Sequence, residues 1–543
     1  FQSSIYRGEV QIETAENTWV IDTYSEENGE IAEQIGRSST AALIWNQVLH
    51  LEVYALLLAV CFGVTWTILK RVLYSPQKAK SWISRNNGKL MYAGIALFAF
   101  VFMFHYANKT SFWVDEFLQI SSDGSIWDAI QNCIEMRDAT PPLFSICAAI
   151  WYHLMPYGEQ YLLLLPIIFT VAAIYLIGVV GEQVYGKAVG ALSASLLASS
   201  TTIWLYVAYE FRSYAFLAFF SILSFYFYVK RNENGLLRSL HKYDWGYSFS
   251  VLGLVMSHYF GMLVCIVFVF SDIYLLIEKK IHWKRGLTYI VPGVTSIAWL
   301  SIVFFMTLQY STVESIASWY LVPGIMQIID IFKYLSGNFD FTYWLFLFGI
   351  AIAIFSFCNK DFQWNRFYII FSLCMIVFTI SIMWFYGNFI NTESTMWESR
   401  YFLVLIPYVV LLSSQVLNIN KKNLMQNIKA FNMVKGTICL FLAILCFFNC
   451  FSVIEASKSR EPWRESADWV YSQGNYIFNN ETVILTTTAA EEWSKYYIER
   501  KGRRDPLNII GSREFSKDDI NQYNRIFSVK ISIPLENTGV SSV

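Results

Sequence analysis

Two adjacent carboxylates, Asp115 and Glu116, follow closely on an apolar run and could do chemistry at a membrane surface. The stretch before that run, residues 70–89, holds six Lys or Arg residues and no acid. Because basic loops stay in the cytoplasm, the pair is expected to emerge on the far side of the membrane. Ionisable groups at that depth are costly and point to a functional site, although the start of a solvated loop would look the same. A carboxylate there can serve as a general base.

A mixture of acidic, basic and imidazole side chains falls at the same predicted membrane depth. Glu210 and Arg212 stand where two apolar runs meet, His258 and Tyr259 mark the next outer turn, and Arg400 marks a later one. Arginines hold a phosphate by paired hydrogen bonds, and a carboxylate can activate a nearby hydroxyl. The alternatives are arginines anchored at lipid headgroups and a histidine at a helix end. The first outer loop supplies Asp115, Glu116, Asp123, Asp128, Glu135, Arg137 and Asp138.

The composition predicts a helical membrane protein that positions these side chains. The chain has 543 residues, of which 55% are hydrophobic and only 15% are charged, whereas soluble domains carry about a quarter charged residues. This excludes a soluble enzyme with one anchor. A net charge of −1, with no basic stripe among aromatics, gives no sign of a nucleic-acid partner. The nine cysteines show no spacing typical of a zinc site.

The fold is predicted to be an all-α polytopic bundle of about twelve transmembrane helices. When the spans alternate, the basic loops at 230–242, 279–285 and 421–435 fall on the same side as 70–89. Residues 141–156 are apolar but short, and counting them as a span would invert every later loop. We therefore expect a helix there that lies in the interface or re-enters from the outer face. The candidate spans are 48–69, 90–107, 161–180, 187–206, 213–231, 245–259, 260–278, 286–308, 342–358, 366–386, 401–417 and 436–454.

Four regions follow from this topology. Residues 1–47 form an extracytoplasmic N-terminal segment, and 48–89 add an extra transmembrane helix with a cytoplasmic loop. Residues 90–454 form the main transmembrane domain, with a first outer loop at 108–160, and 455–543 form a small extracytoplasmic α/β domain. Within it we expect helices at 463–473 and 489–500 and strands at 482–488 and 525–533. The chain begins at Phe1 without a Met or a signal peptide, so we expect that residues are missing upstream.

Several motifs, taken in order, resemble the polyprenyl-phosphate-sugar glycosyltransferases of the GT-C fold. Within that fold the motifs most resemble the bacterial protein-mannosyltransferase-like proteins of glycosyltransferase family 39. Thr140 departs from that branch, which usually has His or Lys there, and residues 1–89 have no counterpart in its usual architecture. The motifs are WVDE at 113–116, DATPPLF at 138–144, EFRSYA at 210–215, HYFG at 258–261, SRY at 399–401 and EPWR at 461–464.

The resemblance implies an inverting membrane glycosyltransferase, a hexosyl or pentosyl transferase. It would move one sugar from a polyprenyl-phosphate donor to a glycan, lipid or protein acceptor on the outer face of a bacterial plasma membrane. Two alternatives are a lipid or glycan transporter or flippase and a non-catalytic glycan-binding membrane protein. No nucleic acid is expected as a partner. The identities of the sugar and the acceptor, the carrier length and the oligomeric state stay open.

The candidate residues receive roles in this scheme. Asp115 is the predicted general base, and Glu116 shares that role, binds the acceptor, or ligates a divalent cation together with Asp115, the one cofactor left open. Arg212 and Arg400 are predicted to hold the donor phosphate because their planar forks match its oxygens. The substrate-binding set also includes four further residues: Arg137, Asp138, His258 and Tyr259. Glu210 is expected to orient Arg212.

The loop at 309–341 is the predicted entrance for the acceptor. It carries Trp319, Tyr320 and Tyr334, and sugar rings often stack on aromatic faces. Residues 324–335 read as an amphipathic helix that could lie on the bilayer and act as a lid. A plain interfacial helix is the alternative.

Overall fold

The structure, a computed structural model, describes most of the helical part of the chain and the strands near its two ends. Contacts divide the chain into two compact units, 1–90 with 111–117 and 458–543, and 91–110 with 118–457, and each is described by itself. The described residues are 9–13, 18–21, 76–107, 112, 116, 119, 125–135, 140–155, 158–233, 240–309, 323–337, 340–357, 363–390, 397–417, 482–486, 508–511 and 525–532.

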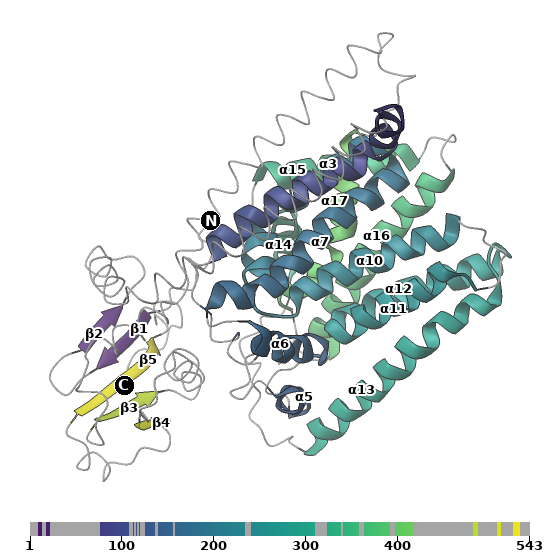
Figure 1. The fold of residues 1–543 in the computed structure, drawn as a ribbon. Helices are drawn as coiled ribbons and strands as arrows, with labels where there is room; N and C mark the ends of the chain where they lie inside the picture. Colours follow the sequence, from purple (N-terminus) through teal and green to yellow (C-terminus); the bar gives the residue numbers. More distant parts are fainter. Residues whose placement is uncertain are drawn as a thin grey trace. The chain divides into compact units, whose positions relative to one another are not determined.

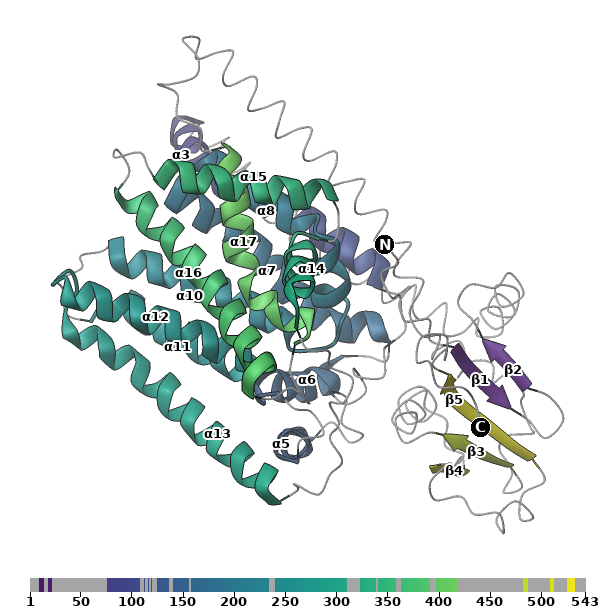
Figure 2. The same cartoon turned by 180° about the vertical axis from the view of Figure 1, so that it is seen from behind.

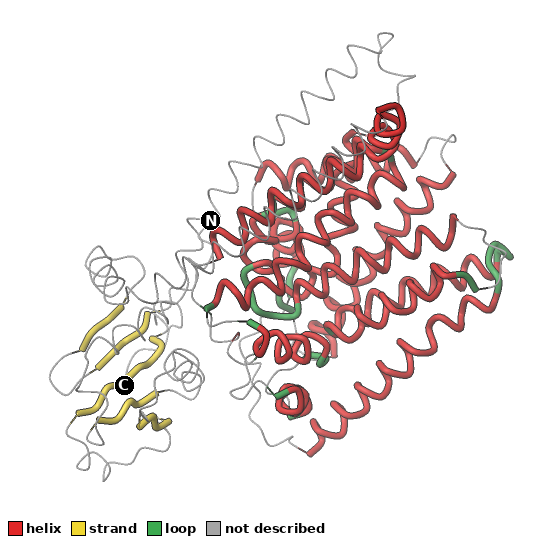
Figure 3. Tube along the Cα trace, viewed as in Figure 1, coloured by secondary structure: helices red, strands yellow, loops and turns green. Residues whose placement is uncertain are grey.

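The larger unit is a bundle of helices (Figures 1 and 3). Its longer helices are α3 (Pro76–Ala107) from residue 91 on, α7 (Glu159–Tyr185), α10 (Tyr214–Glu233), α11 (Lys242–Ser257), α12 (Tyr259–Ile277), α13 (Ile290–Gln309), α15 (Asp340–Phe357) and α16 (Gln363–Phe385). The shorter ones are α5 (Ile126–Ile134), α6 (Leu143–Leu154), α8 (Lys187–Ala198), α9 (Thr201–Ile203), α14 (Ile325–Leu335) and α17 (Ile406–Ser413). Irregular turns are the π-helices η1 (Trp204–Ala208) and η3 (Tyr386–Ile390) and the 3₁₀-helices η2 (Trp283–Tyr289), η4 (Ser399–Leu405) and η5 (Ser414–Leu417).

Several of these helices are suited to a membrane. Among the described residues, five are long and apolar enough to cross one, or six if the bent pair 187–198 and 201–208 counts as one span. Two of the expected spans, 48–69 and 436–454, lie outside the described residues. A helix occurs at each of the other expected spans. The polytopic helical class is therefore confirmed.

Glycines let neighbouring helices of the bundle approach closely. A Cβ atom at Gly181 of α7 would lie 2.8 Å from the Cα of Gly190 in α8. Small residues at such crossings bring two backbones into contact inside a membrane, where the hydrophobic effect does not drive association. Deeper in the bundle the rings of Phe225, Phe371 and Tyr408 pack together, with centroids 5.5 Å apart for Phe225 with either partner. These contacts join α10, α16 and α17.

The short apolar segment at 141–156 forms α6, which has 12 residues. A helix of that length is about 18 Å long, well short of the roughly 30 Å of a bilayer core. The prediction that it is not a full span is confirmed. Whether it lies in the interface or re-enters stays a prediction.

The smaller unit holds one five-stranded sheet, in the order β2-β1-β5-β3-β4. Its strands are β1 (Glu9–Glu13), β2 (Thr18–Ile21), β3 (Thr482–Thr486), β4 (Asn508–Gly511) and β5 (Arg525–Ser532). Strands β3 and β5 occur where the sequence predicted strands, while the helices expected at 463–473 and 489–500 lie outside the described residues. Strand β1 pairs antiparallel with β5, with Ile12 opposite Val529. Both ends of the chain thus build one sheet, a pairing that the sequence alone did not predict.

Candidate functional site

One buried charge cluster joins two of the predicted motifs. Arg400 Nη1 lies 3.8 Å from Glu210 Oε1, and Arg400 Nε lies 3.6 Å from Glu398 Oε1. Arg400 is 8% exposed and Glu210 is 2% exposed. Two carboxylates thus flank one guanidinium at distances that leave ion pairs rather than close hydrogen bonds.

Glu210 and Arg400 both lie next to segments of irregular helix geometry. The path from α8 into α9 and η1 bends by 55°, and the π-helix η1 ends directly before Tyr209 and Glu210. Arg400 lies in the first turn of the 3₁₀-helix η4, which Ser221 of α10 fixes by a 2.8 Å hydrogen bond to the carbonyl of Val404. Bulges and tight turns of this kind are frequent at functional sites because they re-aim side chains.

The predicted first outer loop, residues 108–160, contacts the same part of the bundle through its described residues. Phe144, in the first turn of α6, lies with its ring centroid 5.4 Å from that of Phe211, the residue between Glu210 and Arg212. The hydroxyl of Ser145 donates a 3.0 Å hydrogen bond to the side chain of Gln119. Two of the predicted motifs, at 138–144 and 210–215, are therefore neighbours in space.

Aromatic rings line the charge cluster. The guanidinium of Arg400 lies 6.0 Å from the ring centroid of Tyr214. The ring of Tyr401, the next residue, lies 4.9 Å from that of His258. Such rings restrict the mobility of the charged groups and lower the local dielectric constant, which strengthens an ionic contact with an anion.

His258 is a neutral helix cap. Its Nδ1 accepts a 3.3 Å hydrogen bond from the backbone N–H of Phe260 at the start of α12. Burial, helped by the positive charge of Arg212, lowers the pKa of His258 to about 3. The imidazole is therefore uncharged near neutral pH, so toward a substrate it can only donate a hydrogen bond from Nε2. The sequence alternative of a histidine at a helix end is confirmed. Its contact with substrate stays a prediction.

The structure describes only some of the other predicted site residues. The hydroxyl of Tyr259 accepts a 3.3 Å hydrogen bond from Trp299 of α13, which directs it toward that helix. Glu116 is fully buried. Asp115, Arg137 and Asp138 lie outside the described residues, so their roles stay predictions. No group of three or more His, Cys, Asp and Glu that could hold a metal occurs among the residues that the structure describes.

Tyr334, one of the loop aromatics expected to stack on a sugar, is only 8% exposed in the structure. The carbonyl of Tyr334 accepts a 2.5 Å hydrogen bond from Thr202, and its ring packs against that of Tyr206 at 5.2 Å. Burial, with the charges of Glu210 and Glu398 nearby, raises the pKa of Tyr334. The amphipathic helix predicted over 324–335 is present as α14, seen from behind in Figure 2. Its C-terminal turn borders the charge cluster.

Glu398 was not among the predicted site residues. It stands two residues before Arg400, in a string of four polar or aromatic residues (398–401) that precedes an apolar span. That string was a usable signal, because an acid beside a predicted phosphate-binding arginine is a ready ion-pair partner. Tyr214 belongs to the motif at 210–215 that the sequence analysis singled out, whereas Tyr206 carried no comparable signal, since tyrosines are common near membrane interfaces.

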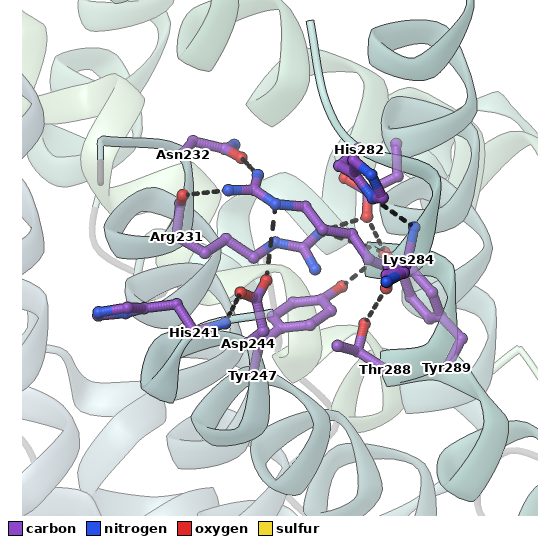
Figure 4. A network of polar contacts seen from close by, with 11 residues as sticks. Arg231, Asn232, His241, Asp244, Tyr247, His282, Lys284, Thr288 and Tyr289 are labelled. Atoms are coloured by element: carbon purple, nitrogen blue, oxygen red, sulfur yellow. Dashed lines mark hydrogen bonds and ion pairs between the residues drawn. The ribbon is translucent and has the colours of Figure 1, made fainter. Parts of the chain in front are cut away.

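A second polar cluster occupies the opposite ends of α10, α11 and α12 (Figure 4). Arg231 forms an ion pair with Asp272, which also accepts a 2.9 Å hydrogen bond from Tyr289. Arg285 lies 3.7 Å from Asp244 and donates a 2.7 Å hydrogen bond to the carbonyl of Arg231. The guanidinium of Arg231 also lies 3.8 Å from the ring centroid of Tyr247. The two arginines and the two aspartates neutralise one another in pairs. We call this set of ion pairs between helices the ionic lock.

No protein-family model and no curated protein matches the chain. Among solved structures, the apo crystal structure of ArnT from Cupriavidus metallidurans aligns with a TM-score of 0.51 at 13% identity, covering 82% of this chain and 89% of that one. The same protein bound to undecaprenyl phosphate gives 0.48 at 11% identity, covering 79% and 86%. The archaeal oligosaccharyltransferase AglB from Archaeoglobus fulgidus, in complex with an inhibitory peptide and a dolichol-phosphate, gives 0.44 at 10% identity, covering 80% and 65%. The likeness to apo ArnT shows the GT-C fold that the motifs predicted.

Proposed function

We propose that the protein is a membrane glycosyltransferase that moves a sugar from a polyprenyl-phosphate donor to an acceptor on the outer face of the membrane. The observation that carries the proposal is Arg400, held between Glu210 and Glu398 where broken helices meet. A buried arginine with aromatic neighbours suits the phosphate of a lipid, and the GT-C fold is consistent with this chemistry. The ligands named for ArnT and AglB, undecaprenyl phosphate and dolichol-phosphate, are of the same chemical class.

Arg212 and Arg400 hold the donor phosphate in the proposed mechanism. Asp115 takes the proton from an acceptor hydroxyl, whose oxygen attacks the anomeric carbon from the side opposite the phosphate. The bond from that carbon to the phosphate oxygen breaks, and the electron pair leaves with the polyprenyl phosphate. Arginines stabilise the charge that develops on this leaving group. Because one displacement occurs, the configuration at the anomeric carbon is inverted.

The proposed topology has about twelve spans, with the α/β domain on the outer face of a bacterial plasma membrane. Strand β1 hydrogen-bonds with β5 near the C-terminus, which supports placing both chain ends on one face of the membrane. The chain between them then crosses the membrane an even number of times. That parity supports the basic-loop pattern, which also requires an even number.

The acceptor is proposed to enter from the aqueous side next to α14. The exposed side chains of Ile325 and Met326 start this helix, and its buried end carries Tyr334 beside the charge cluster. A helix with one apolar end exposed and the other fixed at the site suits a lid on the membrane surface. Deleting residues 315–322 should then abolish transfer while leaving donor binding largely intact. Full transfer by that variant would reduce the loop to a connector.

The decisive experiment follows transfer from purified polyprenyl-phosphate sugars in proteoliposomes. A panel of hexosyl and pentosyl donors identifies the sugar, and activity after EDTA treatment shows whether Asp115 and Glu116 use a divalent cation. Wild-type protein should transfer sugar, and Asp115→Asn should lose transfer while still binding the donor. Glu278→Gln, whose carboxylate pairs with Lys280 at 3.8 Å near the opposite end of α12, is the matched control and should stay active.

Other outcomes would favour the alternatives. Movement of labelled lipid across the bilayer without transfer would make the protein a transporter or flippase. Glycan binding that Asp115→Asn leaves intact, with no transfer from any donor, would make it a non-catalytic binding protein. Loss of transfer in Glu116→Gln, with near-native turnover in Asp115→Asn, would reverse the roles of the two carboxylates.

A further inference from the structure

The two carboxylates beside Arg400 differ sharply in their exposure to solvent. The side chain of Glu210 is 2% exposed, whereas that of Glu398 is 26% exposed. Moving Arg400 away from Glu210 would weaken an ion pair of a carboxylate that water does not reach, which is strongly unfavourable. Glu398 can exchange its ion pair for water at a lower cost than Glu210, because about a quarter of its side chain already reaches solvent. An anion arriving at Arg400 therefore displaces Glu398.

The backbone at Glu398 is fixed, so the exchange needs only a side-chain rotation. The ring of the preceding residue, Trp397, packs on Phe402 with centroids 5.0 Å apart. The carbonyl of Glu398 accepts a 3.0 Å hydrogen bond from the N–H of Tyr401, which begins η4. The side chain of Glu398 makes no capping hydrogen bond to that helix. It is therefore not needed to begin η4 and is available for another role.

We infer that Glu398 and the donor phosphate take turns as partners of Arg400, and that the return of Glu398 promotes release of the spent polyprenyl phosphate. This rests on the proposed function. The donor phosphate is a diester with one negative charge. The spent carrier is a monoester whose second ionisation, near pH 6, brings its charge toward −2.

The change in charge explains why such a competitor is useful. A fixed arginine site binds the more highly charged product more tightly than the donor, so it tends to retain its own product. A carboxylate that returns to Arg400 opposes this, because it replaces the phosphate as the counter-ion and repels it. Glu398 is thus proposed as a positioning residue for the product-release step and takes no part in bond breaking.

The test measures the dissociation constant of undecaprenyl phosphate and of dolichyl phosphate for protein in nanodiscs. Glu398→Gln removes the charge at nearly constant size, and Glu398→Ala removes it with the side chain. Both should bind the carrier roughly three- to tenfold more tightly than wild type. Glu398→Asp should stay near wild type, and so should Glu278→Gln, which removes a carboxylate from a distant ion pair. In steady-state transfer, KM for the donor and kcat should fall together in Glu398→Gln, because release slows.

The outcomes separate the inference from the proposed function. If wild type binds a carrier and neither charge-removing variant binds it more tightly, the exchange is refuted while the glycosyltransferase remains. If wild type binds neither carrier, the proposed function fails and the exchange with it. Inorganic phosphate, which has the head without the tail, should compete at least a hundredfold more weakly, because the buried tail contributes most of the affinity. Equal competition would show that Arg400 serves a soluble anion.

Discussion

Arg400 Nη1 lies 3.8 Å from Glu210 Oε1, so the end of one broken helix and the start of a 3₁₀-helix share a single charge pair. A hydrogen bond from helix α10 also fixes the backbone near this pair. The hydroxyl of Ser221, about two helical turns into α10, donates to the carbonyl of Val404 at 2.8 Å. The backbone that carries Glu210 and the backbone that carries Arg400 are thus fixed to one another. A site built this way is pre-organised for an anion, which reduces the cost of ordering it on binding.

Replacing Arg212 with Lys should reduce transfer almost as much as replacing it with Ala. Lysine keeps the charge but loses the planar fork that pairs with two phosphate oxygens. We expect a loss of about a hundredfold in kcat/KM for both variants, corresponding to roughly 2.7 kcal/mol. The measurement is initial-rate transfer in proteoliposomes. Unchanged donor affinity and rate in both variants would remove Arg212 from the site.

The ionic lock formed by Arg231, Asp272, Arg285 and Asp244 should contribute strongly to stability. Arg231→Met leaves Asp272 buried beside Tyr289 without its counter-ion, and breaking such a pair costs about 3–5 kcal/mol. The double variant Arg231→Met with Asp272→Leu should recover much of the loss, because two matched apolar groups replace the two charges. Thermal unfolding in detergent measures both.

The matched control for the lock is the exposed pair of Lys280 and Glu278, whose side chains are 50% and 47% exposed. Lys280→Met should change stability by no more than about 1 kcal/mol. A similar loss of stability at both pairs would mean that burial does not increase the contribution of the ion pair to stability.

Stability should fall in mild acid because of His258. Its pKa is about 3 in the folded protein and 6.5 in an unfolded chain, so the unfolded state binds more protons as the pH drops below 6.5. The loss is about 1.4 kcal/mol at pH 5.5 relative to neutral pH and grows until the pH approaches 3. His258→Asn keeps a cap at the start of α12 but does not titrate. Comparing the unfolding midpoint of the two proteins between pH 7.5 and 5 should show a shallower fall for the variant. Parallel curves would contradict it.

The sheet predicts that the two chain ends can be cross-linked. Cysteines at Ile12 and Val529, which face one another across β1 and β5, should form a disulfide on mild oxidation. Cysteines at Val10 and Arg525 lie six positions out of register, about 20 Å apart along the strand, and should not. Migration on non-reducing gels shows the bridge, and labelling by a membrane-impermeant thiol reagent shows its side. A bridge in the second pair alone would refute this register.

The sequence by itself determined the class of the protein and the order of its motifs. Apolar runs and alternating basic loops are local in the chain, and a bilayer selects helices wherever such runs occur because every backbone group must be hydrogen-bonded within the segment. The position of α14 was predicted to within one residue for the same reason, since its apolar face has a helical period. The resemblance of the motifs likewise predicted the GT-C fold.

Tertiary structure alone decided which side chains meet. The partnership of Arg400 with both Glu210 and Glu398 depends on the bend before η1 and on the 3₁₀ start of η4, and neither is marked by proline or glycine in the sequence. The burial of Tyr334 was likewise decided by the fold, because α14 packs its last residues onto Thr202 and Tyr206. The sheet that both chain ends share could not be predicted from the sequence either. Hydrogen bonds between strands join backbones of any sequence, so the pairing of β1 with β5 becomes visible only once the two ends lie together.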